Sequence, residues 1–267
     1  MSDPLVSLPQ AGFLQTDRRD AWWLQPLIVL GGLGAFVVYV NLRVWMGTHY
    51  YFTGGGASYL SPFYSPVLWG DYHHAWFGGF PDWWPAFITP AMPILWAPAG
   101  FRMTCYYYRG AYYKAFWADP PSCAVGEPRK GYRGEQKFPL IIQNIHRYLL
   151  YFALAFLVIL AYDAWLAMWF IDEMTGRASF GIRVGTIVLT LNFVFLACYT
   201  FGCHSLRHLI GGANNTMGDM QRSCYNCVSA FNRKHMNWAW ISLVWVAFSD
   251  AYVYACSAGA ITDYRIF

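Results

Sequence analysis

The residues best suited to chemistry in this sequence lie at the end of the stretch 193–210, FVFLACYTFGCHSLRHLI. An apolar run finishes there in Cys203, His204, Arg207 and His208. On a helix His204 and His208 are four residues apart, so both imidazoles project from one face, one turn apart. That spacing suits two ligands of one metal, or one ligand with a hydrogen-bonding neighbour. We therefore predict a redox layer at this point, which the other elements must surround.

The composition is that of a membrane protein. Of 267 residues, 57% are hydrophobic and 12% are charged, against about 25% charged in soluble domains. The 14 Trp and 20 Tyr are typical of rings at lipid–water boundaries. A dispersed net charge of +4 does not indicate nucleic-acid binding. The seven cysteines do not form the framework of a small secreted domain, and the N-terminus does not read as a cleaved signal peptide.

Five apolar segments are long enough to cross a hydrocarbon core, which takes about 20 residues. The second is interrupted by prolines, and the third is longer than the core requires, so its polar first turns should protrude. The sequence therefore predicts an all-α integral membrane bundle of five transmembrane helices, forming one domain over residues 1–267. The predicted spans are 22–42, 83–101, 138–171, 184–210 and 236–261.

The basic residues predict the orientation of the bundle. With a cytoplasmic N-terminus, fourteen of the eighteen Lys and Arg residues lie on the inner side, seven of them in a long inner loop over 102–137, as the positive-inside rule favours. The outer connection 44–82 has no Lys or Arg and is rich in Gly, Tyr and Trp. We expect this loop to lie on the membrane surface as an aromatic cap.

With that topology, sulfur and imidazole groups from separate spans share one inner layer. The predicted metal ligands are Cys105, Cys123, His146, His204 and His208. Two cofactors suit such a layer. Haem b needs two axial histidines, and His146 with His204 or His208 would serve; a Rieske-type [2Fe-2S] cluster needs two thiolates and two imidazoles, which Cys105, Cys123, His204 and His208 would supply. The co-located thiols favour the cluster, although the spacing of soluble Rieske motifs is absent.

A quinone pocket is predicted beside this layer. Arg207 is a fixed cation that could orient a quinone oxygen or a cluster sulfur, and Tyr107, His235 and Trp238 could line the pocket with it. His235 also suits a plain interfacial hydrogen-bonding group.

Other polar and sulfur-containing residues have simpler interpretations. Ionisable groups inside spans are costly. We expect Asp163 and Asp250 to be paired structurally, and a part in a proton path is the alternative. Cys198 and Cys256 are expected to fill space in the core. The Cys224–Cys227 pair is a single CxxC motif with no second pair, and it could hold a metal or carry redox chemistry. His49, His73 and His74 lie on the outer side and could ligate a second, outer haem.

Four strings resemble a known family. They are FRMTCYYYRGAYYKAFWADPPSCAV at 101–125, FPLIIQNIHRYLLYF at 138–152, CHSLRH at 203–208 and NRKHMNWAWISLV at 232–244. Together they look like the membrane-anchor subunit of succinate dehydrogenase, of the actinobacterial, single-anchor, five-span kind. The resemblance covers most of the chain from Trp83 onward.

The resemblance implies a role in electron transport within a bacterial inner (plasma) membrane. Such an anchor takes electrons from an iron–sulfur subunit docked on the cytoplasmic face and passes them to menaquinone or ubiquinone, while the flavoprotein subunit holds the succinate site. Better-known five-span anchors hold two haems on histidines in both halves of the membrane. Here the helix histidines crowd the inner half, which favours a single inner centre. The alternatives are a freestanding haem b quinone oxidoreductase and a purely structural anchor.

Overall fold

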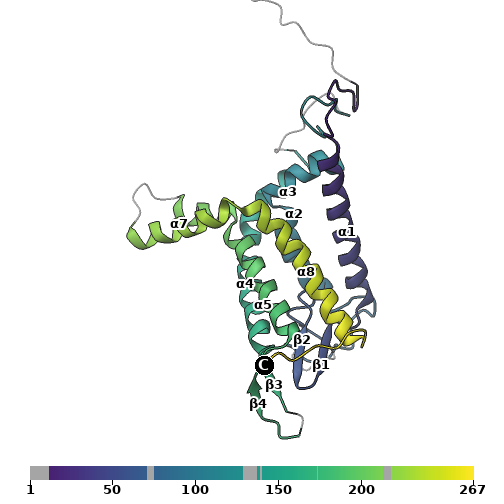
Figure 1. The fold of residues 1–267 in the computed structure, drawn as a ribbon, viewed down its shortest axis with the longest axis vertical. Helices are drawn as coiled ribbons and strands as arrows, with labels where there is room; N and C mark the ends of the chain where they lie inside the picture. The colour runs from purple at the N-terminus through teal and green to yellow at the C-terminus, as the bar shows by residue number, and fades with distance from the viewer. Residues whose placement is uncertain (1–11, 71–74, 129–136, 139, 173, 213–217) are drawn as a thin grey trace, which may run out of the picture. The chain divides into compact units, whose positions relative to one another are not determined.

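The computed structural model describes residues 12–70, 75–128, 137–138, 140–172, 174–212 and 218–267. The chain divides into two compact units. The first unit comprises residues up to Ala35 together with Arg102–Ile145, and the second comprises Phe36–Phe101 with His146–Phe267. Both are mostly helical, which confirms the predicted helical class (Figure 1). That the whole chain forms one domain stays a prediction.

Four helices in the described part of the chain are long and apolar enough to cross a membrane. They are α1 (Leu24–Met46), α4 (His146–Leu166) with the 3-10 turn Leu140–Ile145 that leads into it, α5 (Val184–Phe201) and α8 (His235–Ser257). At about 1.5 Å per residue, the 23 residues of α1 and of α8 exceed the hydrocarbon thickness. These helices account for four of the five predicted spans.

The remaining predicted span, 83–101, is helical only in its second half. Residues 81–92 form successive turns, with the amides of Trp84, Ile88 and Met92 donating to carbonyls three residues earlier, and α2 (Met92–Met103) has 12 residues with Pro98 inside it. Proline supplies no N–H to a helix and clashes with the preceding turn, so closely spaced prolines keep this segment from forming one long helix. A fifth crossing here stays a prediction.

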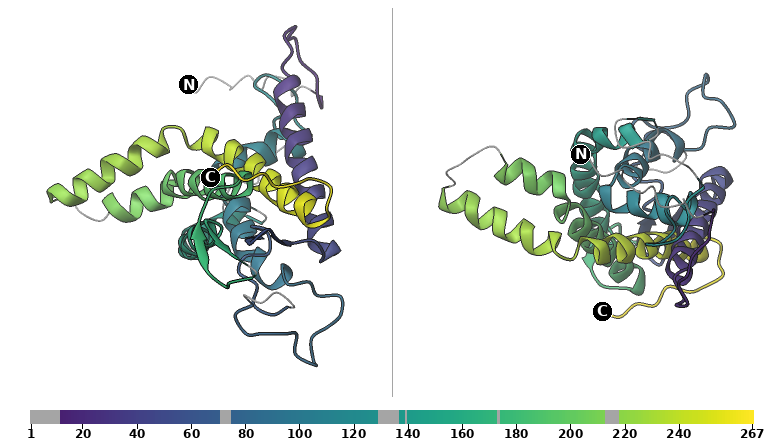
Figure 2. Two further views of the ribbon diagram at one scale, coloured as in Figure 1. Left: turned by 60° about the horizontal axis from the view of Figure 1, so that its bottom comes forward. Right: turned by 90° about the horizontal axis from the view of Figure 1, so that it is seen from above.

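Two other spans end earlier than predicted. The helix expected to reach Ile171 stops at Leu166, and residues Trp169–Ile171 form strand β3, which pairs antiparallel with β4 (Ala178–Phe180). The helix expected to reach Ile210 stops at Phe201. Cys203 then takes an extended conformation, and a separate helix α6 (His204–Gly211) follows. An antiparallel partner, α7 (Asp219–Asn232), packs beside α6, as Figure 2 shows.

The first part of the aromatic outer connection, up to about Val67, folds into the protein, whereas Trp76, Phe77 and Phe80 near its end are exposed. Strands β1 (Tyr51–Gly54) and β2 (Ala57–Leu60) form a hairpin, and its two turn residues, Gly55 and Gly56, have φ of +54° and +79°. Two positive φ angles are what a tight hairpin turn requires. A Cβ on Gly56 would come within 2.6 Å of the Ile171 carbonyl oxygen.

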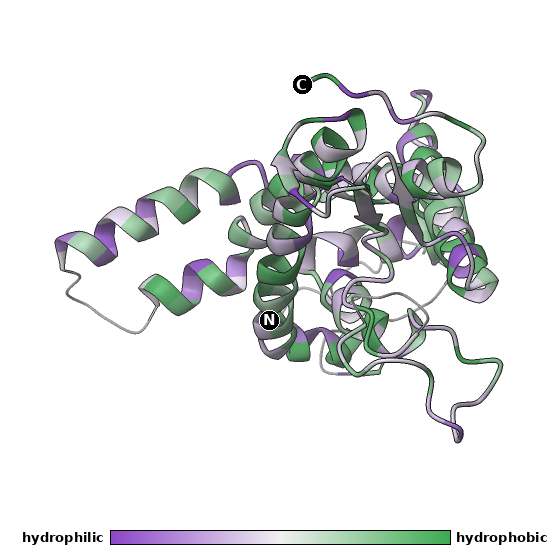
Figure 3. Ribbon diagram, turned by 90° about the horizontal axis from the view of Figure 1, so that it is seen from below, coloured by the Kyte–Doolittle hydropathy of each residue, from purple (hydrophilic) through white to green (hydrophobic). Residues whose placement is uncertain are grey.

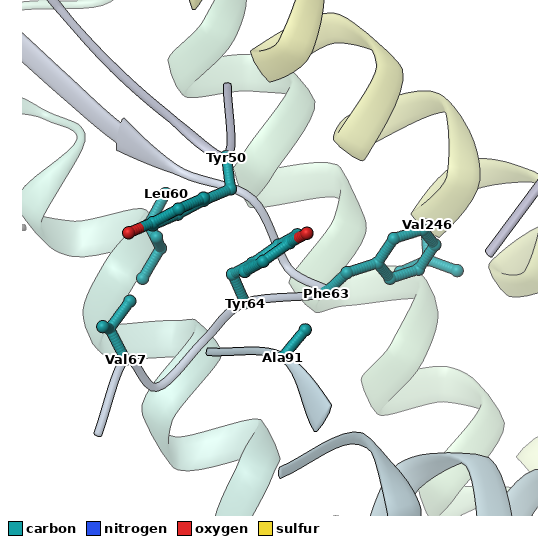
Figure 4. Close-up of a cluster of buried hydrophobic side chains, with 7 residues drawn as sticks. All are labelled: Tyr50, Leu60, Phe63, Tyr64, Val67, Ala91 and Val246. Atoms are coloured by element: carbon teal, nitrogen blue, oxygen red, sulfur yellow. The ribbon is translucent and has the colours of Figure 1, made fainter. Parts of the chain in front are cut away.

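The hairpin leads into a buried cluster of hydrophobic side chains. The rings of Tyr50 and Tyr64 stack with centroids 4.5 Å apart, and the Tyr64 hydroxyl donates to the Arg43 carbonyl oxygen over 2.6 Å. Burial in such a cluster removes large aromatic surfaces from water, which explains why the loop turns inward. The members of this cluster, drawn in Figure 4, are Tyr50, Leu60, Phe63, Tyr64, Val67, Ala91 and Val246.

Candidate functional site

A histidine and a cysteine meet where three helices of the second unit begin or end. His146 is the first residue of α4, and Cys203 caps the N-terminus of α6 directly after α5 ends. Both are buried, and His146 Nε2 lies 3.2 Å from Cys203 Sγ. Helix α5 ends at Phe201, and Cys203 is extended before α6 begins. The contact with His146 is made at this break between the two helices.

Phe101 fixes the His146 ring in two ways, by stacking on the ring and by a backbone hydrogen bond. Phe101, near the end of α2, stacks parallel to it with centroids 4.4 Å apart and planes inclined by 10°. The Phe101 backbone also forms a hydrogen bond with the imidazole. Imidazole orientation is usually fixed through the nitrogen that does not face the site. Here that arrangement leaves Nε2 directed at the Cys203 sulfur.

A second imidazole, that of His235, is connected to His146 by a chain of ring contacts through Phe101 and Tyr199. Tyr199 on α5 packs edge-on against Phe101 at 5.8 Å and stacks on His235, the first residue of α8, at 5.0 Å with planes inclined by 11°. Gly202 brings the backbone close to this histidine: a Cβ there would lie 3.1 Å from His235 Nδ1 and 2.9 Å from the Cys198 carbonyl oxygen. The glycine is therefore needed for a close approach to His235.

The arrangement can do one of two things chemically. The thiol can donate a weak hydrogen bond to a neutral imidazole. Alternatively, the sulfur and the nitrogen can both turn to one metal centre, since thiolate and imidazole are the ligands of zinc and of Rieske-type iron–sulfur sites. Within the described residues, no three His, Cys, Asp or Glu side chains gather as a metal-binding group.

The other predicted ligands have different surroundings. Cys105, in the first unit, is buried and caps helix α3 (Tyr106–Ala111), while Cys123 is exposed. His204 and His208 share one face of α6, with ring centroids 6.5 Å apart. Both side chains are exposed on the surface of this subunit. The ligand roles assigned to these four residues stay predictions.

The predicted quinone residues are spread over several elements. Arg207 faces α7: its Nε donates to Ser229 Oγ over 3.0 Å, and its guanidinium lies 4.8 Å above the Tyr225 ring. Trp238 is half-buried one turn after His235 on α8. Tyr107 belongs to the first unit, where its ring packs edge-on against Tyr108. Their roles in quinone binding stay predictions.

Paired carboxylates lie toward the other end of the helices. Asp250 is completely buried and receives hydrogen bonds from Arg43, Tyr39 and Ser61, and Asp163 accepts one from the Ser65 hydroxyl. Structural pairing of both carboxylates was expected, although the Arg43 partner was not.

The remaining cysteines and histidines lie outside this layer. Cys256 is buried and Cys198 is half-buried, whereas Cys224 and Cys227 are exposed on α7. His49 Nδ1 lies 3.3 Å from Ser257 Oγ. His73 and His74 fall outside the described residues.

A family model and a solved structure both relate the chain to succinate dehydrogenase. A family model described as "Actinobacterial succinate dehydrogenase subunit SdhC" matches residues 24–259. The chain belongs to this family. It is also similar to a chain in the solved structure of the Mycobacterium smegmatis Sdh1 complex in the apo form, at 37% identity and a TM-score of 0.86, over 98% of this chain and 97% of that one. The comparison with curated proteins finds no match.

For this SdhC-family subunit, reasoning from sequence missed the partner of His146. Cys203 lies in the predicted redox stretch but is not among the predicted metal ligands, and the sequence assigns no role to Phe101 or Tyr199. A signal was present in the sequence. Gly202 and Cys203 separate an apolar helix from a polar segment, and a break there buries the residue after the glycine.

Proposed function

We propose that this membrane subunit of an actinobacterial succinate dehydrogenase passes electrons from a docked iron–sulfur subunit to a quinone, through a redox centre that includes His146 and Cys203. The observation that carries the proposal is the buried contact of 3.2 Å between His146 Nε2 and Cys203 Sγ. An ionisable residue buried in a membrane subunit is by default a candidate functional group, and here its partner is a thiol.

The donor types fit a Rieske-type [2Fe-2S] centre better than a haem b. An axial haem ligand needs its imidazole nitrogen directed at iron across an open, flat space. The His146 nitrogen instead abuts a sulfur, and one ring face is covered by Phe101. A Rieske centre uses imidazole and thiolate together, and His235 is a second imidazole in the same aromatic chain. The thiolate roles predicted for Cys105 and Cys123 stay predictions.

When bound, such a cluster accepts and releases one electron at a time. The contribution of this chain is positioning: Phe101 fixes the His146 ring, Tyr199 fixes the His235 ring, and the α5–α6 break presents Cys203. Buried aromatic walls also keep water away, which tunes the potential of a metal centre. Arg207, Trp238 and Tyr107 are proposed to bind the menaquinone or ubiquinone. His235, which the sequence also assigned to the quinone pocket, is proposed here to belong to the redox centre.

The partners and location follow from the same proposal. The side of the membrane rich in Lys and Arg is proposed to face the cytoplasm, with the N-terminus there, and to dock the iron–sulfur subunit. The flavoprotein subunit would hold the dicarboxylate site. The membrane is proposed to be the bacterial inner (plasma) membrane.

The test is electron transfer in the assembled complex with Cys203→Ser. Succinate-dependent quinone reduction should fall by at least about tenfold, the scale expected when a metal centre loses a ligand or its support, while succinate oxidation with an artificial acceptor is retained. The matched control is Cys227→Ser on exposed α7, which should leave both activities unchanged. Equal quinone reduction in wild type and Cys203→Ser would reject the proposal and favour a purely structural anchor.

A further inference from the structure

Helices α6 and α7 form a hairpin that projects sideways from the membrane-type helices of the second unit, and Figure 1 shows α7 lying across their direction. We call residues His204–Gly211 and Asp219–Asn232 the lateral hairpin. It begins three residues after α5 ends at Phe201 and finishes three residues before α8 starts at His235. Because α5 and α8 are both candidate spans, the hairpin must lie at the level where these spans leave the hydrocarbon core.

One side of α7 is an exposed apolar stripe. Met220, Cys224, Cys227 and Phe231 follow spacings of four, three and four residues, which places them along one line of the helix. Met220 is 83% exposed, Cys224 and Cys227 are exposed, and Phe231 is half-buried. Hydrophobic and hydrophilic residues alternate around the hairpin in Figure 3. Nothing in the described part of the chain covers this stripe fully.

The neighbouring side of α7 packs against α6. Val228 is buried, and Tyr225 and Ser229 receive the Arg207 side chain of α6. Gln221 Nε2 donates to the Ile210 carbonyl oxygen over 2.6 Å. The apolar stripe is therefore separate from the contact between the two helices.

The side opposite the stripe is polar and basic. Arg222, Asn226 and Arg233 lie along it and are exposed, and Lys234 follows the helix. Of the described residues 203–235, only Asp219 is acidic. A helix with an apolar stripe on one side and cationic residues on the other is typical of elements that lie in the plane of a lipid surface.

We propose that the lateral hairpin is an interfacial anchor: it lies flat in the lipid–water boundary, with the stripe of Met220, Cys224, Cys227 and Phe231 in the acyl-chain region and the basic side at anionic headgroups. Position, orientation and charge all support lipid as the occupant, since juxtamembrane basic residues are attracted to anionic leaflets. The inference goes beyond electron transfer. It also gives the Cys224–Cys227 pair a role as membrane-facing apolar residues instead of metal ligands.

The test uses the assembled complex in nanodiscs of anionic phospholipid, which expose both membrane faces to reagents. Two labels are applied in parallel: a charged, water-soluble maleimide, and a phospholipid with a diazirine in its acyl chain. Cleavage after Arg222 and Arg233 gives one peptide containing Cys224 and Cys227, so mass spectrometry can localise both labels. The matched control is Asn226→Cys, which puts a thiol in the same peptide on the polar side.

The lipid-facing stripe should take the photolabel, and the thiol at position 226 should react with the maleimide about tenfold faster than Cys224 and Cys227, because water-soluble reagents are excluded from the acyl region. Maleimide labelling of Cys224 and Cys227 as fast as at position 226 would mean a water-exposed stripe and would overturn the proposal. Protection of both cysteines from both labels would mean that another protein subunit covers the stripe, which overturns it equally. Either result leaves the redox proposal untouched, since that rests on quinone reduction.

Discussion

At the scale of single residues, Asp250 is a fully buried charge that accepts hydrogen bonds from three side chains. Arg43 Nε donates to its Oδ2 over 2.7 Å, and the Tyr39 hydroxyl donates to the same oxygen over 2.6 Å. Ser61 Oγ donates to Oδ1 over 2.6 Å, and the guanidinium also lies 4.4 Å from the Tyr254 ring centroid. A buried charge is tolerated only when it is paired and its remaining lone pairs are satisfied. The network therefore ties the end of α1 to α8 and to the outer hairpin.

Replacing Asp250 by Ala should destabilise the protein by about 3–5 kcal/mol, because Arg43 is left as a buried, unpaired cation. The measurement is thermal unfolding in detergent, with Asp17→Asn, an exposed carboxylate, as a control expected to be neutral. The double variant Arg43→Met with Asp250→Leu should recover most of the loss. If the double variant loses as much free energy of unfolding as Arg43→Met and Asp250→Leu lose together when made singly, the ion pair is not the interaction lost.

Gly202 allows a second prediction about the candidate redox centre. Gly202→Ala should weaken quinone reduction severalfold, because the new Cβ would crowd His235 Nδ1 at 3.1 Å and the Cys198 carbonyl oxygen at 2.9 Å. Gly34→Ala is the control, since a Cβ there meets nothing within 4 Å. Both variants should insert into the membrane and bind the partner subunits. Normal turnover in Gly202→Ala would show that the His235 position does not matter to electron transfer.

The contacts of the predicted ligand residues depend on features that the sequence does not reveal. Residue types and helix ends predict a layer of imidazole and thiol groups. The structure brings His146 and Cys203 into contact, and the roles of the other predicted ligands stay predictions. Sequence could not reveal which histidine faces which sulfur, because that depends on where a helix breaks. The exposed positions of His204 and His208 follow from the same break after Phe201.

At the scale of elements, local chemistry predicts the strongest features well. Runs of apolar residues predicted four of the membrane helices to within a few residues at most ends. The segment rich in proline was predicted to be irregular, and it contains turns before α2. The short strands β1–β4 were not predicted, because they are stabilised by contacts with segments distant in sequence, such as the Ile171 amide donating to the Gly56 carbonyl.

The β3–β4 connection gives a prediction about pH. The Asp172 carboxylate accepts hydrogen bonds from the amides of Thr175 and Met174, over 3.1 and 2.8 Å, and these hold the pKa of Asp172 below its ordinary value of 3.8. A lowered pKa in the folded state means that the stabilisation of the turn is present above pH 3.8 and is lost as the pH falls through the folded value.

Hydrogen exchange should therefore speed up at the Met174 and Thr175 amides on acidification, after correction for the intrinsic pH dependence of exchange. Asp172→Ala should exchange faster at neutral pH as well, because both amides lose their acceptor. Asp172→Asn keeps an acceptor oxygen but cannot titrate, so its turn should show no acid-induced loosening. The same acid response in wild type and Asp172→Asn would assign the effect to another group.

At the scale of the whole molecule, the chain belongs to a family of succinate dehydrogenase membrane subunits, and its redox role is a proposal. The match over residues 24–259 and the 37% identity to a chain of the M. smegmatis Sdh1 complex place this protein among membrane subunits of actinobacterial succinate dehydrogenases. Resemblance in four strings already indicated this family. Composition and hydropathy indicated only a membrane protein, because they do not distinguish an anchor from a transporter.

The central claim is that the subunit holds an iron–sulfur centre at His146 and Cys203. The most direct measurement compares low-temperature EPR spectra, with iron and sulfide content, of the dithionite-reduced wild-type complex and the Cys203→Ser complex. Wild type should contain one [2Fe-2S] signal beyond those of the docked iron–sulfur subunit, and Cys203→Ser should lack it, with iron and sulfide each lower by about two atoms per complex. Identical spectra and metal content in the two complexes, or strong Soret bands of haem in the wild type, would contradict it.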